Sequence, residues 1–254
     1  MDQTPSFNRA LVEKYDRPGP RYTSYPTAPQ FHQAFAIDDY RSAAQETNEA
    51  PTLKPLSVYI HIPFCKSLCY YCACNKIITH KTDRAVEYLD YLKREIRMQA
   101  ALFDRSRKLT QLHLGGGTPT YLTSDQLADL MATLHDAFNM DGSDNHEFSL
   151  EVDPRTVTPA QIHQLRELGF NRLSFGVQDF DEQVQIAVNR IQTEEQTREL
   201  VQAARDARFK SISVDLIYGL PLQTVESFGV TLDKIIDIRP DRIAAYSYAH
   251  LPDL

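Results

Sequence analysis

The feature that most constrains the fold of this sequence is a regular alternation of short apolar segments and helical patterns, which begins at residue 56. Six segments are short and rich in β-branched and aromatic residues, which is typical of strands. They span 56–62, 109–114, 147–152, 172–177, 211–217 and 242–248. Repeated strand–helix alternation predicts a parallel sheet with right-handed crossovers, either an open doubly wound sheet or part of a (β/α) barrel.

Helix signals fill the intervals between these strands. Apolar residues recur at helical spacing in 83–103, 124–138, 158–168 and 225–236, a further helix is expected to begin at Thr193, and a shorter one is expected at 38–47. Ser124, Thr158 and Thr193 are placed to cap the helices that they begin, and Gln196 would complete a capping box with Thr193. Gly169 predicts the end of the helix expected at 158–168, because glycine is common directly after the last helical residue.

Composition and charge narrow the class of protein. The chain has 254 residues, of which 42% are hydrophobic, and 27 basic against 34 acidic side chains give a net charge of −7. This acidic balance argues against a broad nucleic-acid interface. No apolar run has the length of a membrane span and the N-terminus carries no signal-peptide pattern, so we expect a cytoplasmic protein that contacts neither nucleic acid nor membrane.

The domain pattern changes along the chain. The stretch RPGPRYTSYPT (Arg17 to Thr27) carries three prolines, which disfavour a regular helix or a central strand. We therefore expect an irregular N-terminal extension over 1–55 and a (β/α) domain over 56–254. No helix follows the sixth strand to cover it, so the sequence has the appearance of a chain truncated at its C-terminus.

The four cysteines of the chain lie within ten residues, directly after the first predicted strand. Cys65, Cys69, Cys72 and Cys74 form the pattern C-x3-C-x2-C-x-C. A disulfide framework would distribute cysteines over distant segments, so this cluster indicates a metal site in a reducing compartment. Three thiolates can hold three corners of a [4Fe–4S] cluster and leave the fourth iron open. Zinc is the alternative, although structural zinc sites usually combine two separated ligand pairs.

Two further patterns lie at the carboxyl ends of the predicted strands, where ligands of parallel α/β folds bind. The second strand is followed by the segment Gly115-Gly116-Gly117-Thr118-Pro119. Its glycines either let the backbone approach a ligand closely or form a flexible turn. Polar residues end or follow the later strands: Glu151, Asp153, Gln178, Asp179, Asp215 and His250. Each alone could be a helix cap or a solvated loop residue. Arg190 could balance one of these acids or be an exposed surface charge.

These motifs together resemble a known family. CKSLCYYC with GGGTP is similar to the radical S-adenosylmethionine (SAM) superfamily. RPGPRYTSYPT, Cys74, EVDPR, FGVQDF and DLIYGLP resemble more specifically the oxygen-independent coproporphyrinogen III oxidases (coproporphyrinogen dehydrogenases), radical SAM oxidoreductases of haem and porphyrin biosynthesis. Members of that family are much longer, so the resemblance implies a partial (β/α)6 TIM-like barrel with an irregular N-terminal extension and without the C-terminal domain.

The resemblance also implies a reaction. Two propionate side chains of coproporphyrinogen III would be oxidatively decarboxylated to vinyl groups, giving protoporphyrinogen IX. A 5′-deoxyadenosyl radical from SAM would abstract the hydrogen, with electrons from a flavodoxin- or ferredoxin-like donor to a monomeric enzyme.

Site residues follow from the same resemblance. The [4Fe–4S] cluster would be held by Cys65, Cys69 and Cys72. Two SAM molecules would bind, the first at Tyr59, Gly116 and Glu151. The second would contact Tyr71, Gly117, Thr118, Gln178, Arg190, Asp215 and Ala249. The resemblance assigns no catalytic side chain and leaves the role of Cys74 open.

Two alternatives remain. One is the haem-chaperone branch of the superfamily, whose members generally lack the RYTSYP extension and the fourth cysteine. The other is a zinc-stabilised binding module without catalysis, which metal analysis would distinguish.

Overall fold

The computed structural model describes residues 7–17 and 27–250. The chain divides into two units, 1–46 and 47–254, so the division lies before the boundary expected at residue 55. The first unit contains α1 (Arg9–Tyr15), a 3-10 turn (Ala28–Gln30) and most of α2 (Ile37–Asn48), the helix predicted at 38–47. Residues 18–26 of the proline-rich motif lie outside the described residues.

The second unit is built on a parallel sheet, and all six predicted strands are confirmed. They are β1 (Leu56–Ile62), β4 (Lys108–Gly116), β6 (Glu147–Val152), β7 (Arg172–Gln178), β8 (Ser211–Tyr218) and β9 (Arg242–Ser247). Their order across the sheet is the order along the chain, and β5 (Asn139–Met140) adds a short pairing to β4. A doubly wound sheet would reverse direction at a switch point, so this order selects the barrel-type alternative.

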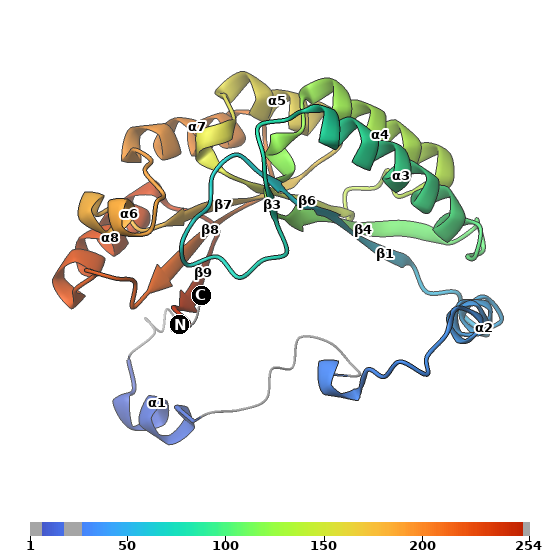
Figure 1. Cartoon of the computed structure of the whole chain (residues 1–254), viewed down its shortest axis with the longest axis horizontal. Coiled ribbons are helices and arrows are strands. Elements are labelled where there is room, and N and C mark those ends of the chain that lie inside the picture. The colour runs from blue at the N-terminus through green and yellow to red at the C-terminus, as the bar shows by residue number, and fades with distance from the viewer. Residues whose placement is uncertain (1–6, 18–26, 251–254) are drawn as a thin grey trace. The chain divides into compact units, whose positions relative to one another are not determined.

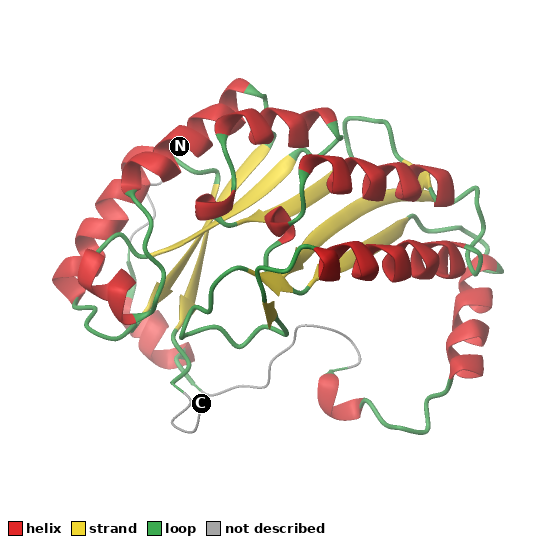
Figure 2. Ribbon diagram, turned by 45° about the horizontal axis from the view of Figure 1, so that its top comes forward, coloured by secondary structure: helices red, strands yellow, loops and turns green. Residues whose placement is uncertain are grey.

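Helices lie along one face of this curved sheet (Figure 1). They are α3 (Asp83–Ala100), α4 (Ser124–Ala137), α5 (Pro159–Glu167), α6 (Glu182–Ala187), α7 (Glu194–Asp206) and α8 (Val225–Ile238). The sequence patterns did not predict α6, which has only six residues. Figure 2 shows the same arrangement from another side, with helices in red lying along the sheet in yellow. In the described parts of the chain, no helix combines the length and apolarity that a bilayer crossing requires.

Two of the three predicted helix caps, Thr158 and Thr193, are confirmed, but the capping box predicted for Thr193 and Gln196 is not, because the Gln196 side chain does not accept from the Thr193 amide in the described structure. Thr158 and Thr193 accept hydrogen bonds from the backbone three residues on, at Gln161 and Gln196. The prediction for α4 was wrong by one residue, because Thr123 is the cap and Ser124 is the first helical residue. Thr123 has the extended backbone that a cap requires, and its side chain accepts from the Gln126 amide, whose own side chain bonds back.

The two faces of the sheet differ in polarity, and this difference creates the site. Side chains that point towards the helices are buried and apolar, such as Leu150 in β6, Phe175 in β7 and Val214 in β8. Side chains at alternate positions point to the opposite, concave face, where Glu151 and Asp215 are only partly buried. Because strand residues alternate between faces, β1, β4, β6, β7 and β8 provide both an apolar core and a polar interior, whereas β9 adds no residue to the core and is largely exposed.

Candidate functional site

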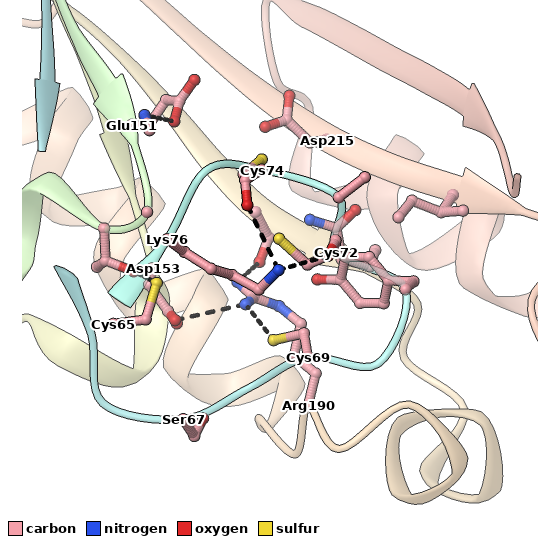
Figure 3. Close-up of a pocket in the computed structure, with 18 of the residues that line it drawn as sticks. Cys65, Ser67, Cys69, Cys72, Cys74, Lys76, Glu151, Asp153, Arg190 and Asp215 are labelled. Atoms are coloured by element: carbon pink, nitrogen blue, oxygen red, sulfur yellow. Dashed lines mark hydrogen bonds and ion pairs between the residues drawn. The ribbon is translucent and has the colours of Figure 1, made fainter. Parts of the chain in front are cut away.

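A cavity of about 500 Å³ lies at the carboxyl ends of the strands, between the cysteine loop and the concave face of the sheet (Figure 3). Its walls come from the loops after β1 and β4 and from the ends of β6, β7, β8 and β9. Every residue that the resemblance assigns to the cluster or to SAM lines this cavity except Tyr59, whereas the strand-end candidates Asp179 and His250 do not line it. Residues more than 180 positions apart, such as Cys65 and Ala249, are therefore brought to one place.

Tyr59 is the residue of that assigned set that the structure leaves out of the cavity wall. Its side chain is 58% exposed on the edge strand β1. The hydroxyl lies 3.0 Å from Nδ1 of His61, and the ring stacks on His113 with centroids 5.7 Å apart.

The cysteine loop is fixed at its base by a short pairing between β2 (Phe64–Cys65) and β3 (Ile77–Ile78). The Thr79 amide donates to the carbonyl of Cys65 at 2.9 Å. The Lys76 ammonium donates to the carbonyls of Cys72 and Cys74 at 2.6 and 3.4 Å. These hydrogen bonds within the loop hold its backbone in place, so that several thiols can face one cavity.

The four thiols differ in burial and acidity, and none forms a disulfide. Cys69 is buried, Cys65 and Cys72 are half-buried and Cys74 is exposed. A hydrogen bond with Cys74 lowers the pKa of Cys72 to about 6, and the nearby Lys76 charge acts in the same direction. Burial raises the pKa of Cys65, although its hydrogen-bond contact with Thr118, at 3.3 Å, opposes this.

The donor chemistry of this loop fits an iron–sulfur cluster. Within the described residues, no three His, Cys, Asp or Glu side chains converge as ligands of a single metal ion. In a cubane cluster each thiolate binds a different iron, so the sulfur atoms need not meet at one point. Cys65, Cys69 and Cys72 all line the same cavity and come from one loop, which satisfies that looser requirement.

The glycine motif is a site of close packing rather than a flexible turn. Gly115 and Gly116 belong to β4, which extends two residues beyond the predicted strand. Gly116 has φ +117°, and a Cβ there would lie 2.8 Å from the His61 ring. At Gly117 a Cβ would lie 2.7 Å from the carbonyl oxygen of Pro63 and 3.0 Å from Sγ of Cys65. A side chain at Gly116 would therefore collide with β1, and one at Gly117 would push the end of β4 away from the cysteine loop.

Two carboxylates occupy the concave face opposite the cysteines. Glu151 accepts a hydrogen bond from the amide of Gly116 at 3.1 Å, which ties β6 to the glycine motif. Asp215 accepts one from the hydroxyl of Ser174 at 2.9 Å. Burial raises the pKa of Asp215 to about 6, with the Ser174 hydrogen bond opposing and the charge of Glu151 adding to the increase.

Gln178 and Arg190 bring unused hydrogen-bonding atoms to the same cavity. The register of β7 is irregular between Gly176 and Gln178, and Gln178 has φ 70°. Its buried Oε1, like Nε of Arg190, finds no partner in the described part of the chain. Arg190 is 7% exposed and pairs with Asp153 at 3.4 Å, so it balances an acid and is not a surface charge.

Sequence reasoning missed three cations at this site, Lys66, Lys76 and Arg155. The signal for Arg155 was present in EVDPR, where it follows the third strand by three residues. Lys76 follows the last cysteine by two residues.

Comparisons with known proteins agree with this geometry. The chain is 49% identical to the oxygen-independent coproporphyrinogen III oxidase of Pseudomonas aeruginosa, over all of this chain and 55% of that protein. It is 48% identical to that of Escherichia coli K12, over 98% of this chain and 53% of the relative. The solved structure of coproporphyrinogen III oxidase from Escherichia coli superposes with a TM-score of 0.88 at 46% identity, covering 99% of this chain and 55% of that one.

The chain thus spans about half the length of the curated relatives it matches. The superfamily match is more complete, because residues 59–235 correspond to the Radical SAM superfamily. That range contains the cysteine loop, the glycine motif and the three carboxylates of the cavity, Glu151, Asp153 and Asp215, and with it the chain belongs to the radical SAM superfamily.

Proposed function

We propose that this chain carries the catalytic barrel of an oxygen-independent coproporphyrinogen III oxidase. The activity would be the oxidative decarboxylation of two propionate groups of coproporphyrinogen III to vinyl groups in haem biosynthesis. The observation that carries the proposal is a cavity in which a three-cysteine loop faces Glu151, Asp215 and Arg190. Its support is identity of 44–49% to several oxidases of that name over 98–100% of this chain.

Membership of the superfamily implies a [4Fe–4S] cluster and SAM. We assign the cluster to Cys65, Cys69 and Cys72, because these thiols share one loop and one cavity. When bound, the reduced cluster and SAM supply a carbon-centred radical that removes a hydrogen atom from the substrate. The work of this chain's own residues is to bind, orient and shield these groups.

Two SAM molecules are part of the proposal. The Glu151 carboxylate, beside Gly116, would receive the first. The second would lie against Gln178, Arg190 and Asp215, where the unpartnered Gln178 Oε1 can accept a hydrogen bond from a ligand. A cavity of about 500 Å³ is within the usual range for small-molecule sites.

The remaining assignments complete the proposal. The substrate would be coproporphyrinogen III, and the electron donor a flavodoxin- or ferredoxin-like protein. Four free thiols in one loop suit a reducing, cytoplasmic compartment. We retain a monomeric state and the division into an extension over 1–55 and a barrel over 56–254 as proposals.

The test is anaerobic reconstitution with iron and sulfide, followed by assays of SAM cleavage with and without coproporphyrinogen III. We expect about four iron and four sulfide per chain and formation of 5′-deoxyadenosine that depends on the cysteines. Zinc without sulfide would support the binding module instead. Tight haem binding without consumption of coproporphyrinogen III would support the haem chaperone.

The variant Cys69→Ser is the decisive control for the site. It should lose both the cluster and SAM cleavage, whereas Cys74→Ser should keep the cluster. Equal retention of iron by wild type and Cys69→Ser would contradict the assignment of the three cysteines.

A further inference from the structure

Two arginines converge on the sulfur of one cysteine at the wall of the cavity. Arg155 lies in a 3-10 turn (Pro154–Thr156) that follows β6, and Arg190 lies between α6 and α7. Nη2 of Arg155 is 3.6 Å and Nη1 of Arg190 is 3.5 Å from Sγ of Cys69. Both distances are hydrogen-bond distances for a sulfur acceptor. Figure 3 shows Arg190 directed at Cys69.

Asp153 holds both arginines in place. Its carboxylate accepts Nε of Arg155 at 3.0 Å and Nη2 at 2.7 Å, and it lies 3.4 Å from Nη1 of Arg190. The backbone amide of Arg155 donates to the same carboxylate at 3.0 Å. Five-donor guanidinium groups held at two or more points keep a fixed direction, so their bonds to Cys69 are geometrically defined.

The charges of this group do not cancel. Two guanidinium groups and one carboxylate leave one net positive charge beside Cys69. Burial alone would raise the pKa of Asp153, but the two arginines hold its pKa below the usual value, so the carboxylate stays ionised. The side chains of Arg190 and Asp153 are only 9% and 10% exposed, so water screens this charge weakly.

We propose that Arg155, fixed by Asp153 and acting with Arg190, raises the reduction potential of a cluster bound at Cys69. This inference rests on the proposed function, which assigns Cys69 as a cluster ligand. Reduction adds one electron, taken from a one-electron donor, and no bond to the protein forms or breaks. The reduced cluster carries one more negative charge, so hydrogen bonds and a net positive charge at its thiolate stabilise it over the oxidised state.

Arg155 is thereby a positioning residue that acts through Cys69. Removing its charge should make the cluster harder to reduce. We expect Arg155→Gln to decrease the equilibrium constant for reduction about tenfold or more. For a one-electron couple this corresponds to a potential about 59 mV more negative.

The experiment is a redox titration of the reconstituted chain, with mediators and dithionite, followed by electron paramagnetic resonance. Wild type, Arg155→Gln, Arg155→Lys and Arg172→Gln are compared after iron and sulfide analysis. Arg172 is the matched control: it is paired with Glu147 at the opposite end of β6 and β7, and its loss changes the net charge equally. We expect a clear negative shift for Arg155→Gln, a smaller one for Arg155→Lys and none for Arg172→Gln.

The outcomes that overturn the inference are distinct from failure of the proposed function. An unchanged potential in Arg155→Gln with full iron content overturns the inference and leaves the cluster assignment intact. An equal shift in Arg172→Gln overturns it, because the effect would then be one of net charge. Loss of the cluster from both Arg155 variants overturns it in favour of a structural role. A wild-type chain that takes up no iron overturns the proposed function itself, and the inference with it.

Discussion

Asp215 is a half-buried carboxyl group whose ionisation should lower the free energy of unfolding, and the size of that decrease can be worked from the structure. It lies within β8, with its side chain on the concave face. Burial raises its pKa from 3.8, the value for an unfolded chain, to about 6. At 1.36 kcal/mol per pKa unit, this difference corresponds to about 3 kcal/mol of folding free energy.

The sign follows from which state holds the proton. Below pH 3.8 Asp215 is protonated in both the folded and the unfolded chain, so the carboxyl group does not lower the free energy of unfolding. Between pH 3.8 and about 6 the unfolded chain loses the proton while the folded chain keeps it. Stability therefore falls as the pH rises through this window and is constant above it. Asp215→Asn cannot ionise, so its free energy of unfolding should not fall in this window. The difference between variant and wild type should therefore grow by about 3 kcal/mol in favour of the variant between pH 4 and 7.

Other charged and titratable groups face Asp215 from the neighbouring elements. Glu151 lies on β6, His113 on β4, Tyr246 on β9 and Arg190 follows α6. All of them are present in both proteins, so the difference between variant and wild type isolates the carboxyl at position 215. Loss of the hydrogen bond from Ser174 would change the difference in free energy of unfolding by the same amount at every pH. The pH dependence of that difference would stay the same.

The assay is urea unfolding of the cluster-free chain under reducing conditions, followed by circular dichroism at half-unit steps of pH. Asp141→Asn is the control, because the side chain of Ser143 and then that of Lys108 lower the pKa of Asp141 to about 2. The stability that the Asp141 carboxylate contributes is lost only below pH 3.8. The difference in free energy of unfolding between Asp141→Asn and wild type should therefore be constant between pH 4 and 7. A flat difference for Asp215→Asn as well would refute the reasoning.

Three further predictions concern the site and the core. After anaerobic reconstitution Cys72→Ser should lose its iron and Cys74→Ser should keep it, and equal loss by iron and sulfide analysis would show that four cysteines are needed. Gly116→Ala should lower the melting temperature, because φ +117° costs a non-glycine residue about 1–3 kcal/mol. Gly142→Ala, where an added Cβ meets no described atom within 4 Å, should change it little, and equal effects would contradict this. Phe175→Ala, at a fully buried position, should lower the free energy of unfolding by about 3–5 kcal/mol in a denaturant titration. A decrease of less than about 1 kcal/mol would show that Phe175 is not part of the hydrophobic core.

The sequence by itself determined the longer strands and helices of this protein and the loop that carries its chemistry, but not α6 or the two-residue strands β2, β3 and β5. Six strands and five helices of the barrel could be predicted because alternation, helical spacing and cap residues are local signals. The cysteine loop was identifiable for the same reason, since all of its thiols lie within ten residues. Where a local signal was ambiguous, as between Thr123 and Ser124, the prediction missed by one residue.

Only the tertiary structure decided the strand order, the burial of Arg190 and the exclusion of Tyr59 from the cavity. The same holds for the glycine motif, whose need for glycine comes from the crowding of Pro63 and Cys65 against it. These features depend on contacts between distant residues, such as Arg155 and Cys69, which are 86 positions apart. A side chain's partners across that separation are fixed by the packing of strands on one another, and no local pattern records them.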